Sequence, residues 1–217
     1  MRNDKVSEMT FLAMFIAIIT VMSFVPWLGY ITIGGVAITL IHIPVLIGAI
    51  FGGKRVGIVL ATTFGVLSMI RAFMTPDAFN VFFQNPLVSV LPRFIFGVMI
   101  WYIYIGLHRL LKPIIVTEDE DEEKKKKLIR LNEFTVLGIT FAVSSMAHTL
   151  ITLTALYIFS FESEVYLLYF ADANVLRFIW FILLSNGFVE VGLAVIIGAP
   201  ITWRLREYLR SDFNTIE

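Results

Sequence analysis

A long, mostly hydrophobic stretch without any charged residue occupies the early part of the chain. Between Glu8 and Lys54 the sequence contains no Asp, Glu, Lys or Arg. A helix that crosses a membrane requires about 20 mostly apolar residues, so this stretch is long enough for two. Near its middle, residues 26–36 contain Pro, Trp, Tyr and Gly, which end helices or favour the membrane–water interface. The pattern predicts two helices joined by an apolar, glycine-rich segment.

More apolar segments of helical length follow along the chain. We therefore expect an all-α membrane protein, a six-transmembrane-helix bundle that forms a single membrane domain over residues 1–217. A charged loop at 112–132 would separate the fourth helix, which Pro92 interrupts, from the fifth. The expected helices cover residues 9–25, 37–53, 56–73, 87–111, 134–159 and 174 to about 200. The last of them is expected to continue through residues 202–210 as a basic amphipathic end.

The composition supports a membrane protein and excludes several classes of site. The chain is 58% hydrophobic and 16% charged, with a mean hydropathy of +0.85. Soluble domains are typically about 45–50% apolar and about 25% charged. Because the chain has no cysteine, it forms no disulfide and has no thiolate metal site or nucleophile. We expect it to lie in the lipid bilayer, with no nucleic-acid partner.

Lysine and arginine predict the orientation of the helices, because cytoplasmic loops are enriched in these residues. Placing the N-terminus inside gives inner segments with basic residues within 2–5, 54–55, 109–130 and 204–210. The outer loops then hold only acidic charges, at Asp77, Glu162, Glu164 and Asp172. Both termini are therefore expected in the cytoplasm, an N-in/C-in topology.

Two conspicuous segments are not expected to be sites. Residues 118–127 are a block of acids followed by a block of lysines, which is typical of a solvated linker or an extended polar helix. Residues 48–55 nearly match a phosphate-binding loop, but Arg55 stands where Ser or Thr is needed to hold Mg²⁺. The chain is therefore expected to bind no cofactor, and any ATP would be used by a partner subunit.

Polar side chains within the membrane carry the functional signal, because ionisable groups at depth are costly and usually face a cavity or one another. With the amides of the 74–86 loop, they form the predicted substrate site. The candidates are His42, Arg71, Asn80, Gln84, Asn85, Arg93, His148, Asn186 and Glu190.

Two interpretations of these residues remain open. The first is a cavity that opens outward and binds an anionic or amide-rich solute, since an arginine fork suits a carboxylate in a dry site. The second is an internal ion pair of Arg71 or Arg93 with Glu190 that only ties helices together. His42 and His148 are equally compatible with hydrogen-bonded core residues.

Small residues recur at a spacing of four, which lets helices approach closely in lipid. Most of these pairs are expected to pack inside the bundle. Ala13 and Ala17, near the N-terminus, could instead face a partner. The other pairs are Gly48/Gly52, Gly53/Gly57 and Ala61/Gly65.

Three segments resemble one family of transport proteins. They are Ala13-Met-Phe-Ile-Ala17, the apolar stretch 26–57, and QNPLVSVLPRFIFG at 84–97. Together with the short helices, they are similar to the substrate-binding S component of energy-coupling factor (ECF) vitamin transporters, over most of the chain to about residue 203. The segments around His42 and Arg93 look most like pantothenate-type members and their close relatives.

The resemblance implies a substrate-binding subunit without catalysis of its own, in a bacterial plasma membrane. It would capture a vitamin or precursor from outside, beneath the loops at 26–36 and 74–85. It would associate with a transmembrane coupling subunit, which Ala13 and Ala17 would contact, and with two cytosolic ATPase subunits that use the ATP. Riboflavin, pyridoxine-like compounds and hydroxymethylpyrimidine-type thiamine precursors remain alternatives to pantothenate.

Two other classes of membrane protein fit the sequence less well. An intramembrane protease would use Glu and His for metal-assisted hydrolysis, but the sequence has no Glu-Glu-x-x-Arg or His-Glu-x-x-His pattern. A self-sufficient secondary transporter would be expected to show an inverted repeat and several membrane acids. Here no repeat is evident, and Glu190 is the one acid that could relay protons at depth.

Overall fold

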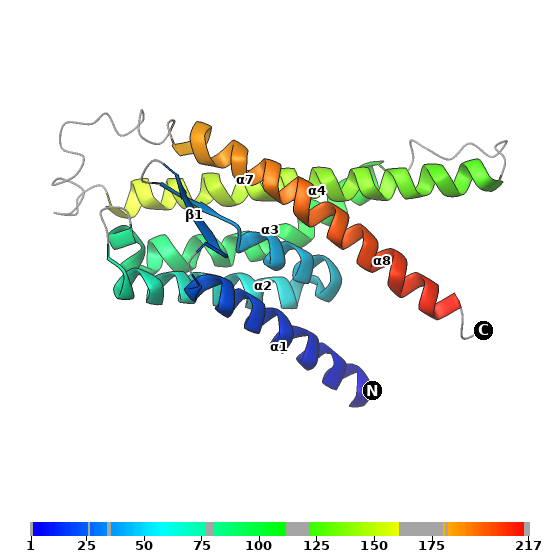
Figure 1. The fold of residues 1–217 in the computed structure, drawn as a ribbon, viewed down its shortest axis with the longest axis horizontal. Coiled ribbons are helices and arrows are strands. Elements are labelled where there is room, and N and C mark those ends of the chain that lie inside the picture. The colour runs from blue at the N-terminus through cyan, green and yellow to red at the C-terminus, as the bar shows by residue number, and fades with distance from the viewer. Residues whose placement is uncertain are drawn as a thin grey trace.

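The computed structural model describes residues 2–25, 27–33, 36–76, 80–111, 122–160, 180 and 182–214. These residues form a predominantly helical bundle with one β-hairpin (Figure 1). The major elements are α1 (Arg2–Phe24), β1 (Tyr30–Ile33), β2 (Val36–Thr39), α2 (His42–Met74), α3 (Pro86–Leu111) and α4 (Glu122–Ser160). The C-terminal helical stretch consists of η3 (Leu183–Gly187), α7 (Phe188–Leu193), η4 (Ala194–Gly198) and α8 (Ala199–Asn214).

Helix α2 is divided into two arms at Gly53. The backbone there has φ 78° and ψ −170°, which a residue with a side chain would adopt only with strain. The two arms run in opposite directions in Figure 1 and pack on each other. A Cβ on Gly57 would lie 2.8 Å from the Cβ of Ala49. The predicted helix break between 53 and 56 is therefore present.

Four helices of the described chain are long and apolar enough to cross a membrane. They are His42–Met74, Pro86–Leu111, Lys127–Phe159 and Leu183–Tyr208. Helix α1 contributes a shorter apolar stretch, Glu8–Phe24. The prediction of a multi-helix membrane bundle is confirmed in this coarser form.

Small residues bring α2 and α3 into close contact, as their spacing predicted. A Cβ on Gly97 would lie 2.7 Å from the Cβ of Ala61 and 2.8 Å from the carbonyl oxygen of Gly57. The hydroxyl of Ser89 donates a 2.9 Å hydrogen bond to the Gly65 carbonyl. The backbones of the two helices can approach this closely because these positions carry little or no side chain.

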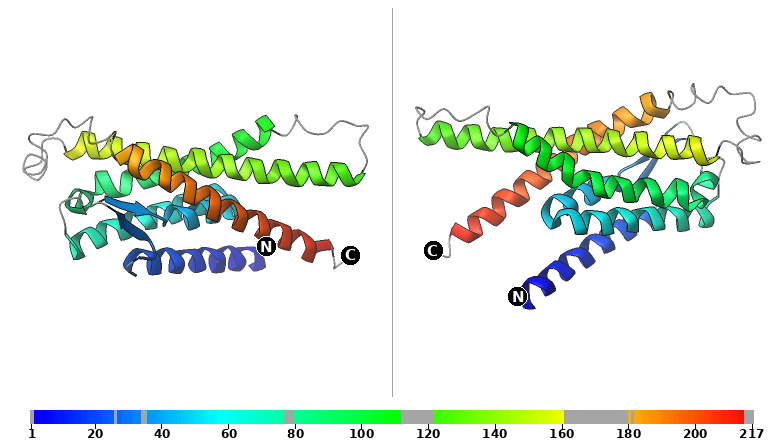
Figure 2. Two further views of the ribbon diagram at one scale, coloured as in Figure 1. Left: turned by 45° about the horizontal axis from the view of Figure 1, so that its top comes forward. Right: turned by 180° about the vertical axis from the view of Figure 1, so that it is seen from behind.

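Two predicted boundaries were wrong. The second helix begins at His42 instead of 37, because residues 36–39 form strand β2 and pair with β1. Part of the expected charged loop, residues 122–132, is helical and lengthens α4, which projects past its neighbours in Figure 2. The last helix continues past Pro200 to Asn214, in agreement with the predicted amphipathic continuation. The remainder of the loop, 112–121, and the outer segment 161–179 lie outside the described residues.

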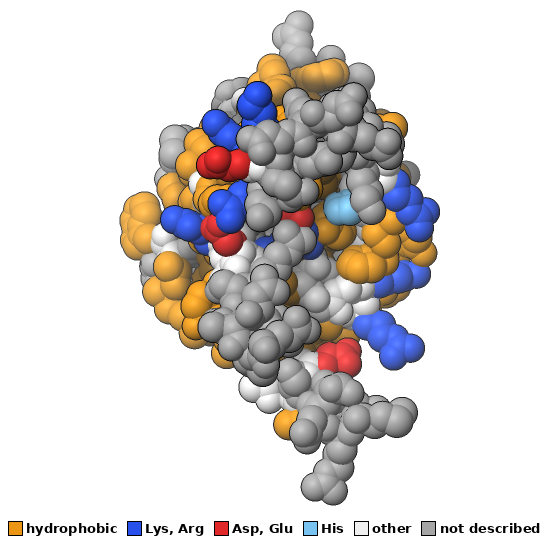
Figure 3. All heavy atoms as spheres, turned by 90° about the vertical axis from the view of Figure 1, so that its right-hand side faces the viewer, with side chains coloured by type: hydrophobic (Ala, Val, Ile, Leu, Met, Phe, Trp, Pro, Cys, Tyr) orange, Lys and Arg blue, Asp and Glu red, His pale blue; other side chains and the backbone are white. Residues whose placement is uncertain are grey.

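Basic side chains gather at the end of the bundle that carries both termini. Figure 3 views this end and shows Lys and Arg around its rim. Exposed basic residues from several helices contribute: Lys54, Arg55, Arg109, Lys124, Lys127, Arg130 and Arg204. The β-hairpin lies away from this end, toward the opposite end of the bundle (Figure 1).

Candidate functional site

Two residues that face each other across the β1–β2 hairpin attach it to the helices on either side. Tyr30 of β1 and Thr39 of β2 are register partners. The guanidinium carbon of Arg71, near the end of α2, lies 3.8 Å from the centroid of the Tyr30 ring. On the other side, the backbone N–H of Thr39 donates a 2.7 Å hydrogen bond to Oε1 of Glu190 in α7. The base of the hairpin is thus held between α2 and α7.

Glu190 also connects α7 to α4. Its second carboxylate oxygen accepts a 2.9 Å hydrogen bond from the hydroxyl of Thr149. Only 5% of the Glu190 side chain is exposed, so both oxygens are satisfied inside the protein. Neither Arg71 nor Arg93 forms an ion pair with it; the ion pairs among the described residues involve Glu207. Of the two open interpretations, the direct Arg–Glu190 ion pair is not formed among the described residues, because hydrogen-bond donors from β2 and α4 satisfy the carboxylate.

Two small cavities lie beneath the hairpin. We call the first the histidine cavity; its volume is about 50 Å³ and it is lined by Thr39, Phe83, Arg93, His148, Thr149, Thr152, Leu153, Leu156, Ile182, Asn186 and Glu190. We call the second the arginine cavity; its volume is about 30 Å³ and it is lined by Tyr30, Thr39, Ser68, Arg71, Asn80, Phe83 and Arg93. They share Thr39, Phe83 and Arg93, so they adjoin one another.

Arg93 lies where the two cavities meet. Its Nη1 donates a 2.8 Å hydrogen bond to the Val88 carbonyl in the first turn of α3. Its guanidinium carbon lies 5.0 Å from the ring centroid of Phe83 and 5.4 Å from that of Phe64. The buried Nε has no hydrogen-bond partner among the described residues. A buried polar atom of this kind normally has a partner, so this donor is available to a bound solute.

The two histidines form a stack inside the bundle. The rings of His42 and His148 lie 5.6 Å apart at an angle of 14°. Nε2 of His42 lies 3.0 Å from the Ser145 hydroxyl. His148 packs against Phe64 and Phe96, and neither of its nitrogens has a partner within the described structure. Since His148 also lines the histidine cavity, its ring can contact a solute there. His42 is not among the described lining residues and stacks on the His148 ring.

Asn186 reaches the histidine cavity from an irregular part of the last helix. Residues Leu183–Gly187 form a π-helical turn immediately before α7. Such turns are rare and are frequent at functional sites. Asn186 and Glu190, four residues apart, both line the cavity. Nothing in the sequence marks this change of helical pitch.

The amides of the 74–86 loop lie in different places. The side chain of Asn80 lines the arginine cavity and donates to the Thr75 carbonyl. Gln84 donates a 3.0 Å hydrogen bond to the Ala72 carbonyl, and Oδ1 of Asn85 accepts one from the Leu87 N–H at the start of α3. Neither Gln84 nor Asn85 lines a cavity described here, so both hold the loop and helix ends in place.

Several cavity residues were missed by sequence reasoning. They are Tyr30, Thr39, Ser68, Phe83, Thr149 and Thr152. Hydroxyl groups are common in membrane helices because they can bond to the preceding turn, as Thr140 does to Val136. Thr149 directly follows the predicted site residue His148, and this is the one feature of the sequence that could have suggested it as a cavity residue. Tyr30 and Thr39 could be found only through the hairpin register.

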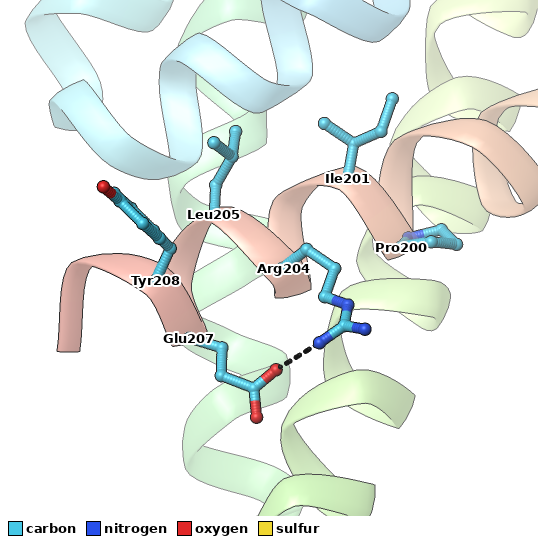
Figure 4. A pocket seen from close by; sticks show the side chains of 6 residues that line it. All are labelled: Pro200, Ile201, Arg204, Leu205, Glu207 and Tyr208. Carbon is cyan, nitrogen blue, oxygen red and sulfur yellow. Dashed lines mark hydrogen bonds and ion pairs between the residues drawn. The ribbon is translucent and has the colours of Figure 1, made fainter. Parts of the chain in front are cut away.

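A larger hollow, of about 680 Å³, lies elsewhere, along α8 near the C-terminus (Figure 4). Its lining includes Ile201, Leu205 and Tyr208, and Arg204 donates a 3.1 Å hydrogen bond to Glu207 at its edge. All of its lining residues come from this one helix, so it is an open surface groove and not an enclosed site. The buried polar groups converge on the two smaller cavities instead.

A helical membrane bundle with buried arginine, imidazole, amide and hydroxyl groups beneath a hairpin is the arrangement expected of a polytopic protein with a candidate internal solute site. Residues 7–202 match the family model described as "ECF transporter, substrate-specific component". The chain belongs to this family, and it is a multi-pass protein of the bacterial plasma membrane.

Two curated relatives are similar to parts of the chain. The pantothenate transporter PanT of Leuconostoc mesenteroides subsp. mesenteroides is 35% identical over 105 residues, which is 46% of this chain and 52% of the relative. The pantothenic acid transporter PanT of Lactococcus lactis subsp. cremoris is 29% identical over 119 residues, or 48% of this chain and 61% of the relative. The chain thus spans about half to three-fifths of the length of these relatives.

Proposed function

We propose that this chain is the pantothenate-binding S component of an ATP-driven ECF importer. The observation that carries the proposal is the convergence of Arg71 and Arg93 with neutral polar groups in two adjoining cavities beneath the hairpin. Pantothenate has a carboxylate, an amide and two hydroxyl groups. Guanidinium groups suit its carboxylate, and hydroxyl, imidazole and amide groups suit the rest. The names of both relatives support the same vitamin.

The proposed topology is six membrane passes with both termini in the cytoplasm. The two arms of α2, divided at Gly53, count as separate passes, and α1, α3, α4 and the continuous stretch from η3 to α8 provide the others. Exposed lysines and arginines at the end with both termini support an inward orientation of that end. The hairpin and its cavities would then face the outside.

The proposed partners are a transmembrane coupling subunit and two cytosolic ATPase subunits. Ala13 and Ala17 are both exposed on α1, where larger exposed neighbours, Met14 and Val21, flank them. A face of small side chains allows another helix to approach closely. The chain itself is proposed to catalyse no reaction and to bind no nucleotide, so that ATP is used by the partner subunits.

Uptake of labelled pantothenate tests this function. Host cells that cannot take up pantothenate would express the chain alone, the coupling and ATPase subunits alone, or all together. We expect uptake only from the complete set. Uptake by the chain alone would favour a secondary transporter. Mass spectrometry of the small molecule that co-purifies with the chain identifies the ligand, and a flavin, pyridoxine or pyrimidine in place of pantothenate would contradict the proposed substrate.

A further inference from the structure

The two cavities differ in charge. Arg71 and Arg93 both line the arginine cavity, and no acidic residue is among the described residues that line it. The histidine cavity is lined by Arg93 together with Glu190, so its charges oppose each other. An anionic group buried in protein is stabilised by nearby positive charge and destabilised by nearby negative charge. The arginine cavity is therefore the more favourable place for a carboxylate.

The donors of the arginine cavity have the geometry for such a group. Arg71 stacks one face of its guanidinium on Tyr30, which leaves the N–H groups at the edge of the plane directed elsewhere. The stack restricts the orientation of the guanidinium before any solute arrives. Arg93 adds its unpartnered Nε from the opposite helix, α3. Planar, pre-oriented donors of this kind bind carboxylates better than a mobile ammonium group does.

The histidine cavity offers mostly neutral groups. The Thr152 hydroxyl and both ring nitrogens of His148 are buried without partners among the described residues. The Glu190 carboxylate is engaged by Thr39 and Thr149 and adds negative charge close by. Hydroxyl groups of a solute, which both donate and accept hydrogen bonds, match this set of partners. A carboxylate of the solute would be repelled by Glu190.

Taking pantothenate as the substrate, we propose that it binds in one orientation, with its carboxylate in the arginine cavity and its hydroxyl-bearing end in the histidine cavity. The amide between them would pass Thr39, Phe83 and Arg93, which the two cavities share. Their volumes, about 50 and 30 Å³, are well below the roughly 300–1,000 Å³ of ligand pockets. Entry of the vitamin therefore requires Phe83 and the hairpin to move outward. This inference rests on the proposed function.

The test compares two ligands across matched variants. Pantothenate and panthenol, its neutral analogue with an alcohol in place of the carboxylate, would be titrated onto the purified full-length chain. The wild-type chain should bind pantothenate at least tenfold more tightly than panthenol. Arg71→Gln should reduce pantothenate affinity about tenfold and leave panthenol affinity within twofold. Arg71→Lys, which keeps the charge but loses the planar donor edge, should retain only part of the preference and serves as the second variant if Arg71→Gln does not fold.

Two further variants test the contacts of the hydroxyl-bearing end of the ligand and the orientation of the Arg71 guanidinium. Thr152→Val, in the histidine cavity, should weaken both ligands equally, because both carry the same hydroxyl-bearing end. Tyr30→Leu removes the ring that orients the Arg71 guanidinium and should weaken pantothenate more than panthenol. If Arg71→Gln weakens both ligands equally, or Thr152→Val weakens pantothenate alone, the orientation is overturned while the substrate assignment stands. If wild type binds neither ligand, the proposed function itself fails and the orientation with it.

Discussion

The backbone N–H of Thr39 donates a 2.7 Å hydrogen bond to the carboxylate of Glu190, although 151 residues separate the two in sequence. This contact joins the β-hairpin that follows α1 to the last helix of the bundle. It also closes one side of the histidine cavity. The position of the hairpin over the site therefore depends on a residue from the far end of the chain.

Replacing Glu190 with leucine should weaken substrate binding by roughly ten- to a hundredfold. The change leaves the Thr39 N–H buried without an acceptor, and loss of a hydrogen bond to a charged group costs about 1.5–3 kcal/mol. Glu190→Gln should have a smaller effect, because its amide oxygen can still accept from Thr39. Titration of substrate onto the purified variants measures both.

The matched control for this prediction is Glu207→Leu. Glu207 contacts Arg130 and Arg204 at the other end of the bundle and is partly exposed. Ion pairs in contact with solvent contribute little, so this variant should bind like wild type. Equal binding by Glu190→Leu and wild type would show that the hairpin is held by other contacts.

Arg93→Ala should reduce substrate affinity at least tenfold, or about 1.4 kcal/mol. Arg93 lines both cavities, and its buried Nε has no hydrogen-bond partner among the described residues. Thermal unfolding in detergent should accompany the titration, because the variant also removes the bond to the Val88 carbonyl. An unchanged affinity in a folded variant would exclude Arg93 from the site.

The double substitution Ala13→Trp with Ala17→Trp should abolish uptake and leave substrate binding by the isolated chain intact. Both alanines are exposed and lie outside the two cavities, so indole rings there would block a partner helix without reaching the substrate. Ile196→Trp, at a position 72% exposed on the last helix, provides the control and should preserve uptake. Loss of binding by the alanine variant would place the pair inside the bundle.

Gly97→Ala should destabilise the bundle, whereas Gly138→Ala should not. A Cβ at Gly97 would lie 2.7 Å from Ala61 and 2.8 Å from the Gly57 carbonyl oxygen, but one at Gly138 would meet nothing within 4 Å. Forcing α2 and α3 apart is expected to cost about 1–3 kcal/mol. Removing a helical glycine without a clash is worth up to about 1 kcal/mol in the other direction. The unfolding midpoints of the two variants should therefore shift in opposite directions.

The sequence predicted the apolar helices and the main intramembrane polar residues, because length, charge and helical period are local properties. It predicted the turn at Gly53 for the same reason. It did not predict the β-hairpin, since residues 36–39 continue an apolar run that reads equally well as helix. Only tertiary contacts, such as those of Tyr30 with Arg71 and Thr39 with Glu190, distinguish the two structures.

The sequence predicted the charged, imidazole and amide groups that line the two cavities, but not the hydroxyl groups of the threonines and Ser68. Arg71, Arg93 and Glu190 stand out because a charge at depth in a membrane is rare. The sequence left open whether Glu190 pairs with Arg71 or Arg93, whereas in the structure Thr39 and Thr149 satisfy it. A threonine in a helix gives no indication whether its hydroxyl bonds to its own backbone or to a distant carboxylate.

Equilibrium binding of labelled pantothenate to the purified chain, without any partner subunit, measures whether the two cavities hold the vitamin. We expect saturable binding of one pantothenate per chain, and Arg93→Ala should weaken it at least tenfold. Saturable binding with no loss on Arg93→Ala, or no pantothenate binding by a folded wild-type chain, would contradict this expectation.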